Sequence, residues 1–438
     1  MEKFMEKFFV LFKFGLKYLY RYRRRYAFLL AALVVSFAVV TIITSQKDGM
    51  YENVYYTAQS HYAGDIIAYA ADSEYGNRMG KKEKDIILNA AASSGMNPIY
   101  IVERTMYMDG AVVFFNGAGI QLKYLMGSNW EEEEHLFGEM SFIDAAYSFP
   151  GDDGIILSVP TANQMGARIG DSVILEVDTV DRQKNTGVFI VKGIVQDTSI
   201  FGYFKAYVSR VSLNRLLLFS DDDCSVIGFF LDNPNDVEQK RVNLYKAISD
   251  KLQISPLVYS RSEMDRARKE SFEGVKIFLY TLQIYLTEVA DLLNAMNILT
   301  YFLYIMMLLI IMVSAATTYR LLLHERTREM GIMRTIGFYG GDLRIILWAE
   351  IIALALVSLL AGFILAVIVS SLLSFISFSW FPSFEIFMKN GRLTALYLPK
   401  TMLINVASVF IILFMVTIHP LFLASRKKLP DLLSGEPL

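Results

Sequence analysis

The sequence has few of the side chains that build disulfides, metal sites or nucleotide sites. It contains one cysteine, Cys224, which excludes an intramolecular disulfide framework and any metal site made from a cysteine cluster. No Gly-x-x-x-x-Gly-Lys-Ser/Thr string is present, so the chain binds no nucleotide through a P-loop. Only four histidines occur, and none stands at metal-ligand spacing with another: His61, His135, His324 and His419.

Other catalytic patterns are missing as well. Glu131–Glu134 and Asp221–Asp223 are acidic runs, but they lack the alternating spacing of a calcium loop, and solvated surface is the favoured interpretation. No nucleophile-elbow string is present. Charged residues in the expected spans are few, and Glu350, at the start of the third span, could pair with Arg344. A proton relay would need more such residues deep in the spans, so an ion-coupled carrier is disfavoured. We expect a non-enzymatic chain without metal or cofactor, driven by energy from another chain.

Long apolar runs are the dominant positive feature. Four runs meet or approach the roughly 20 residues that a bilayer requires: 27–46, 292–319, 351–379 and 401–419. A cleaved signal peptide is the rival interpretation of the first run. That run begins more than twenty residues into the chain and lacks a small-residue cleavage site, so a retained anchor is favoured.

Charge is segregated along the chain and predicts the topology. Residues 1–26 carry eight Lys/Arg and two Glu, whereas residues 46–275 carry 33 Asp/Glu and 22 Lys/Arg. Basic segments stay in the cytoplasm, which places both termini and loop 320–347 inside. Residues 47–275 are then extracytoplasmic. The expected location is the inner (cytoplasmic) membrane of a bacterium, with membrane lipids as partners and no nucleic acid.

Residues 1–26 form a separate N-terminal segment. Within it, lysines and glutamates fall on one side of a helical wheel, and phenylalanines and leucines fall mostly on the other. The pattern indicates a cytoplasmic amphipathic helix that lies in the inner membrane interface. A helix packed on the spans is nearly as good an interpretation.

The segment 47–275 alternates strand-like and helix-like stretches, which predicts a large α+β domain between the first and second spans. Residues 276–438 follow as a domain with three spans. A helix from about Ser262 to Asp291 is expected to continue into the second span as a rigid rod. The expected strands are 112–115, 155–159, 172–177, 187–194 and 206–208, and the expected helices are 81–94 and 237–252.

A charged string joins the second and third apolar runs. It reads Glu-Arg-Thr-Arg-Glu-Met-Gly-Ile-Met-Arg-Thr-Ile-Gly-Phe over residues 325–338. Its Arg/Glu pairs at helical spacing, followed by Gly337, Gly340 and Gly341, predict a short exposed helix with a loose C-terminal stop. Another protein could bind such a helix. A basic loop that only sets topology is the alternative.

The same string resembles the loop after the second span in permeases of the FtsX/MacB superfamily of ABC transporters. Outside the loop, Gly64–Ile66, Gly154–Ser158, Gly166, Gly170–Val173 and Phe189–Ile194 are similar to segments of lipoprotein-releasing (LolC/LolE-type) permeases. The tail fits in part, with Pro420 and Ala424 in place and Pro430 displaced by one residue.

The resemblance implies a permease subunit that works with an ABC ATPase on a separate chain and with a second permease, identical or related. ATP would be bound by the ATPase, and the outer domain would release lipoprotein cargo, with a periplasmic carrier as a further partner. Two alternatives are kept: a MacB-like exporter of peptides or macrolides, and an FtsX-like scaffold in cell division. The residues implied in ATPase coupling are Glu325, Arg326, Arg328, Glu329, Gly331, Arg334 and Gly337.

A cargo entrance between the spans is a further expectation. Small or polar residues of the first and second spans could line it, although ordinary helix packing through small residues is an equal alternative. These residues are Ser36, Ala38, Thr41, Ala295, Asn297 and Thr300.

Overall fold

Four helices of the computed structural model are long and apolar enough to cross a membrane, by length and composition, in the part of the chain that the structure describes. The structure describes residues 10–15, 17, 20–21, 23–143, 148–196, 201–202, 204–233, 236–378, 386–389 and 391–426. The membrane helices are α2 (Arg23–Tyr62), α9 (Leu282–Glu325), α11 (Gly340–Leu373) and α12 (Pro399–Arg426). The prediction of four spans is confirmed, and α2 and α9 are much longer than the apolar runs they contain.

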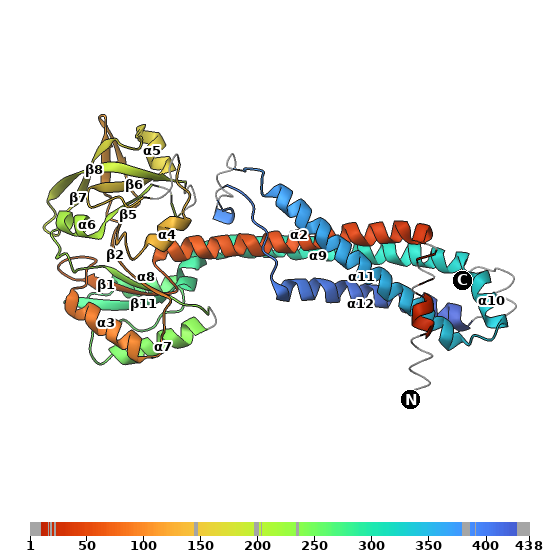
Figure 1. Ribbon diagram of the computed structural model, residues 1–438. Helices are drawn as coiled ribbons and strands as arrows, with labels where there is room; N and C mark the ends of the chain where they lie inside the picture. The colour runs from red at the N-terminus through yellow and green to blue at the C-terminus, as the bar shows by residue number, and fades with distance from the viewer. Residues whose placement is uncertain are drawn as a thin grey trace. The chain divides into compact units, whose positions relative to one another are not determined.

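A sheet-rich α+β domain lies between the first and second spans, as predicted (Figure 1). Its sheet has eleven strands in the order β11-β1-β10-β2-β5-β9-β6-β8-β7-β3-β4. The strands are β1 (Ile66–Asp72), β2 (Tyr100–Tyr107), β3 (Val112–Phe115), β4 (Ala118–Gln121), β5 (Tyr124–Ser128), β6 (Gly154–Ser158), β7 (Ser172–Asp178), β8 (Lys184–Val195), β9 (Lys205–Ser209), β10 (Val226–Phe230) and β11 (Val275–Thr281). Its helices are α3 (Lys81–Ser93), α4 (Glu134–Glu139), α5 (Val159–Met165), α6 (Arg210–Leu217), α7 (Val237–Ile248) and α8 (Arg261–Lys269).

The chain divides into two compact units. One, which we call the membrane unit, comprises residues Met1–Tyr51, Leu293–Ser377 and Arg392–Leu438. The other, the inserted domain, comprises Glu52–Leu292 and Phe378–Gly391. The expected boundary at residue 275 falls inside the inserted domain, because β11 begins there and completes the sheet beside β1.

The predicted rod from Ser262 to Asp291 is wrong. Helix α8 ends at Lys269, strand β11 follows, and α9 begins only at Leu282. The β-branched and aromatic residues of Val275–Thr281 favour an extended strand, and pairing with β1 along seven residues fixes that choice.

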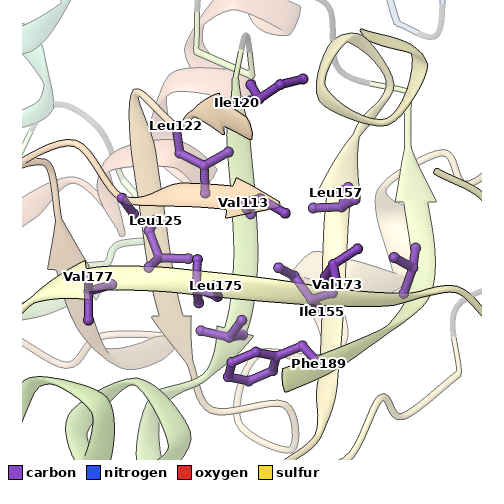
Figure 2. Close-up of a cluster of buried hydrophobic side chains, with 14 of the residues drawn as sticks. Val113, Ile120, Leu122, Leu125, Ile155, Leu157, Val173, Leu175, Val177 and Phe189 are labelled. Atoms are coloured by element: carbon purple, nitrogen blue, oxygen red, sulfur yellow. The ribbon is translucent and has the colours of Figure 1, made fainter. Parts of the chain in front are cut away.

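Two hydrophobic cores lie among the described residues of the inserted domain. The first lies under β3 to β9 and is built from alternating inward residues such as Val173, Leu175 and Val177 of β7 (Figure 2). The second packs α3 and α7 against β1, β10 and β11. Cys224 belongs to this second core and is fully buried, where it packs as a small hydrophobic residue.

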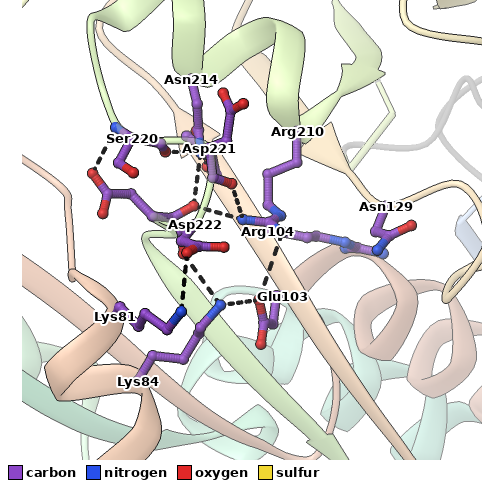
Figure 3. Close-up of polar contacts among 12 residues, drawn as sticks. Lys81, Lys84, Glu103, Arg104, Asn129, Arg210, Asn214, Ser220, Asp221 and Asp222 are labelled. Atoms are coloured by element: carbon purple, nitrogen blue, oxygen red, sulfur yellow. Dashed lines mark hydrogen bonds and ion pairs between the residues drawn. The ribbon is translucent and has the colours of Figure 1, made fainter.

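Charged side chains of α3, β2 and α6 and of the loop after α6 form a network of polar contacts in the inserted domain, as Figure 3 shows. The predicted solvated run Asp221–Asp223 lies here, and its carboxylates pair with cations: Arg78 to Asp223 at 2.6 Å, Lys81 to Asp222 at 3.4 Å and Arg215 to Asp221 at 3.3 Å. No group of three or more His, Cys, Asp or Glu side chains that could hold a metal occurs among the described residues. The carboxylates of the run thus form ion pairs with Arg78, Lys81 and Arg215.

The deepest charge pair of the inserted domain also holds the end of α2. Arg104 and Glu133 are fully buried, with their closest side-chain atoms 2.6 Å apart. Arg104 also donates to the carbonyls of Ser60 (2.6 Å) and His61 (3.2 Å) in the last turn of α2. Those carbonyls have no partner within the helix, so the guanidinium satisfies them and complements the negative end of the helix dipole.

We therefore predict that Arg104→Ala strongly destabilises the inserted domain. Removing one partner leaves the carboxylate of Glu133 buried and unpaired, at a cost of about 3 to 5 kcal/mol. Arg215→Ala is the matched control, because its pair with Asp221 is more than half exposed and contributes at most about 1 kcal/mol. Thermal unfolding of the purified chain, followed by near-ultraviolet circular dichroism, measures both. Equal shifts in the two variants would contradict the assigned role of Arg104.

Candidate functional site

A short helix, α10 (Thr327–Thr335), connects the second and third membrane helices. It ends as predicted just before Gly337, whose φ of +106° lies in the left-handed region that stops a helix at little cost in a glycine. Gly340 and Gly341 do not belong to this stop, because they open α11. Asp342 caps the start of α11, its carboxylate accepting from the Tyr339 N–H at 3.1 Å.

The seven residues expected to couple to an ATPase are not all on the surface. Glu325, Arg328 and Gly337 are exposed, and Glu329 and Arg334 are half-buried. Arg326 and Gly331 are buried, so neither lies on the exposed face of the loop.

Arg326 makes the central buried contact of the site. Its guanidinium pairs with the carboxylate of Glu350 of α11, at 2.5 Å and 3.2 Å, and donates to the hydroxyl of Tyr26 of α2 at 2.8 Å. That hydroxyl in turn donates to Glu350 at 2.7 Å. The expected partner of Glu350, Arg344, is therefore replaced by Arg326. We call Tyr26, Arg326 and Glu350 the polar joint.

Apolar side chains hold the buried face of α10. Met330 packs with Tyr319 and Leu323 of α9 and with Leu343, Leu347 and Ile351 of α11. Gly331, next to Met330 in the chain, is buried as well. This face of α10 is thus fixed to the neighbouring membrane helices.

The opposite face of α10 is open. Arg328, Ile332 and Ile336 follow one another at four-residue spacing and are exposed, Ile332 by 48% and Ile336 by 74%. Tyr339, beyond the helix end, is 76% exposed. We call Arg328, Ile332, Ile336 and Tyr339 the exposed stripe. No signal in the charge pattern alone pointed to its isoleucines.

The N-terminal segment packs on the membrane helices in its described part. Leu11 is buried, and the backbone at Gly15 approaches Ile346 and Ala349 of α11 so closely that a β-carbon there would lie 2.7 Å from the Ile346 carbonyl oxygen. The ring of Phe14 lies 6.4 Å from that of Phe338. These contacts favour the packed-helix interpretation over an interfacial helix. Residues 1–9, 16, 18–19 and 22 of the predicted segment lie outside the described residues.

The expected cargo-entrance residues fall into different environments. Ala38 and Thr41 are buried within the membrane unit, and Ser36 is half-buried. Asn297 donates to the hydroxyl of Tyr51, which joins α9 to α2. Ala295 is exposed and Thr300 half-buried. The structure therefore does not bring the six together along one opening.

The inserted domain has its own junction at the helix ends. Asp65, directly before β1, is buried, and its carboxylate accepts from the hydroxyl of Tyr55, the Gln59 amide (2.8 Å) and the Leu231 N–H (2.7 Å). Its carbonyl accepts from the N–H of Leu282, the first residue of α9, at 3.0 Å. One residue thus joins the last turns of α2 to the first turn of α9.

Comparison with known proteins places the site in a recognised segment. Residues 301–429 match the family model described as FtsX-like permease C-terminal. No curated protein matches the chain. The matched residues include α10, α11, α12 and most of the second span, so the match covers the candidate site.

Three solved structures are similar to the chain at low scores. The extracellular domain of the noncanonic ABC-type transporter YknZ from Gram-positive bacteria has 11% identity and a TM-score of 0.30, covering 49% of this chain and 98% of that one. The periplasmic region of MacB from Actinobacillus actinomycetemcomitans has 10% identity and a TM-score of 0.29, covering 53% and 96%. A domain of a putative permease protein from Porphyromonas gingivalis has 11% identity and a TM-score of 0.27, covering 50% and 89%.

The family match thus rests on the membrane helices and on the loop between them. The chain is a multi-pass membrane protein whose residues 301–429 are similar to the C-terminal region of FtsX-like permeases.

Proposed function

We propose that the chain is the permease subunit of an ABC transporter and that the exposed stripe of α10 docks on a separate ATPase. The observation that carries this proposal is the two-sided character of α10. Its buried face is clamped to α9 and α11, whereas Ile332 and Ile336 are left exposed beside the cation Arg328. Exposed apolar side chains next to a charge are typical of a protein–protein contact.

The proposed partner chain supplies the ATP chemistry. Among the described residues near α10, the buried carboxylate of Glu350 is paired with Arg326 in the polar joint. A carboxylate held in this way is a poor proton carrier, so energy from ATP hydrolysis on a second protein is favoured over ion coupling.

A second permease, of the same or a related chain, is the other proposed partner. In the most apolar 18-residue stretch of α9, only 11% of the residues are buried, against 39% in the corresponding stretches of α2 and α11. A membrane helix so little covered by its own chain has a face for lipid or for another helix. Pairing through α9 would bring two copies of α10, and two ATPases, side by side.

For cargo, we propose lipoproteins released from the outer face of the inner membrane. The support is the likeness of the Gly-Asp segments of the inserted domain to those of lipoprotein-releasing permeases. In this mechanism the inserted domain, outside the membrane, performs the work, and no polar path across the bilayer is needed. Export of peptides or macrolides and a scaffold role in division are the alternatives that the experiments below separate.

The proposed orientation can be tested by cysteine labelling. Burial raises the pKa of the Cys224 thiol to about 12, so the native cysteine stays protonated and unreactive at neutral pH. In intact cells, Lys184→Cys, at an exposed position of β8, should react with an impermeant maleimide, whereas Ile336→Cys should react only after the membrane is opened. Labelling of Ile336→Cys from outside would overturn both the topology and the docking proposal.

Docking can be tested on the exposed stripe. Ile332→Glu should abolish retention of the ATPase on the purified chain, because a desolvated charge replaces an apolar contact. Ile332→Pro should do the same by breaking α10, at about 3 kcal/mol or more. The readouts are a P-loop ATPase in the purified complex and its ATP hydrolysis.

The matched control is Ile174→Glu on β7, at a similar exposure of 45% but far from α10 in the sequence. It should leave both readouts unchanged. Normal ATPase retention in Ile332→Pro would mean that α10 is only a topology signal.

The cargo is tested by depletion of the chain in its host. Lipoproteins should accumulate, acylated, in the inner membrane, while macrolide sensitivity stays the same. Intact lipoprotein sorting with raised sensitivity to drugs or peptides would favour the exporter. Intact sorting with cells that fail to separate would favour the division scaffold.

A further inference from the structure

The polar joint connects three separate helices at one point. Arg326 stands between the end of α9 at Glu325 and the start of α10 at Thr327, and its backbone is not helical (φ −97°, ψ 1°). Its side chain reaches Glu350, eleven residues into α11, and Tyr26, in the first turn of α2. The residue at which the chain bends from α9 into α10 is therefore bonded to both other helices.

The joint is closed to water. The side chains of Arg326 and Glu350 are 4% and 3% exposed, and Tyr26 is 6% exposed. Separation of the two charges would leave each uncompensated in surroundings of low dielectric constant, which is far costlier than separation of a surface pair. A displacement of α10 is consequently met more easily by movement of the whole joint than by its rupture.

Tyr26 is bonded on both sides. Its hydroxyl donates to Glu350 and accepts from Arg326, so the donor hydrogen and one acceptor site are used together. Tyr319 of α9 provides a contrast, since it is also buried (5% exposed) but its hydroxyl has no hydrogen-bond partner among the residues that the structure describes. Of these two buried tyrosines, only Tyr26 links helices through its hydroxyl.

From this geometry we infer that Tyr26 is a positioning residue for coupling, and that the polar joint passes the displacement of α10 to the first and third membrane helices as well as to the second. The inference rests on the proposed function, since it assigns to α2 and α11 a share of the movement that an ATPase would impose on α10. The apolar cluster around Met330 of α10 includes described residues of α9 and α11 but none of α2, so the packing in that cluster does not connect α10 to α2.

The joint itself can be tested without an ATPase. Spin labels at Arg24→Cys on α2 and Thr335→Cys on α10, both exposed positions, report the distance between the two helices in the full chain in lipid vesicles. The buried Cys224 should not take up label. We expect a narrow distance distribution that Tyr26→Phe broadens and that Tyr319→Phe leaves narrow. Equal distributions in the two variants would overturn the inference.

Coupling is tested on the complex with the co-purified ATPase. Tyr26→Phe should leave the amount of bound ATPase and the KM for ATP unchanged, because the exposed stripe and the nucleotide site are intact. It should lower kcat about tenfold, the factor expected when a buried hydrogen bond to a charged group is lost. Tyr319→Phe, with the same chemical change, should keep the original kcat.

Two further outcomes separate the inference from the function beneath it. If Tyr26→Phe and Tyr319→Phe have the same kcat while ATPase is bound, the role of Tyr26 in coupling is refuted and the proposed function stands. If the unaltered chain retains no ATPase, the proposed function fails and the coupling role fails with it. Glu350→Gln removes the charge that Arg326 and Tyr26 share. It should broaden the spin-label distance distribution and lower kcat at least as much as Tyr26→Phe does.

Discussion

The pairing of β1 with β11 is the constraint on which the inserted domain depends. These strands are the first and last of the domain in sequence, and they pair antiparallel from Ile66 with Thr281 to Asp72 with Val275. Because β1 follows α2 directly and β11 leads directly into α9, the pairing fixes the end of one membrane helix beside the beginning of the next. Asp65 and the stacked rings of Tyr62 and Tyr285, 4.1 Å apart, secure the same point. A change in the separation of the two helices must therefore strain the sheet.

Polar contacts have an analogous role in the membrane unit. The polar joint binds α2, the start of α10 and α11 by a charge pair that is too buried to open cheaply. Farther along α2, Asn405 of α12 donates to Thr44 at 2.8 Å, and Thr401 of α12 donates to Asp48 at 2.6 Å. Such interhelical hydrogen bonds specify which helices are neighbours, a choice that apolar packing within lipid determines only weakly.

Several acidic, cysteine and histidine side chains of the inserted domain make structural contacts. The carboxylates of Asp221–Asp223 form ion pairs, and Cys224 is a core residue. His61 is buried among aromatic rings and beside Lys205. Buried ion pairs in each of the two units connect separate secondary-structure elements. The proposed function assigns the chemical step to another protein and gives this chain the transmission of a displacement that begins at α10.

The sequence by itself determined the four spans and the position of α10, because hydrophobic run length, period and glycine stops are local signals. In the inserted domain it located five of the strands (β3, β6, β7, β8 and β9) and two of the helices (α3 and α7). It did not determine β11, since Val275–Thr281 favours a strand by its β-branched and aromatic residues but is also apolar enough to be taken for the start of the second span. Pairing with β1, some 200 residues earlier, decides between the two. The same holds for Arg326, which looks like its exposed neighbour Arg328 in the sequence. Only the tertiary structure decided that one arginine is buried against Glu350 and Tyr26 while the other faces solvent, because burial depends on contacts between helices that are remote in the chain.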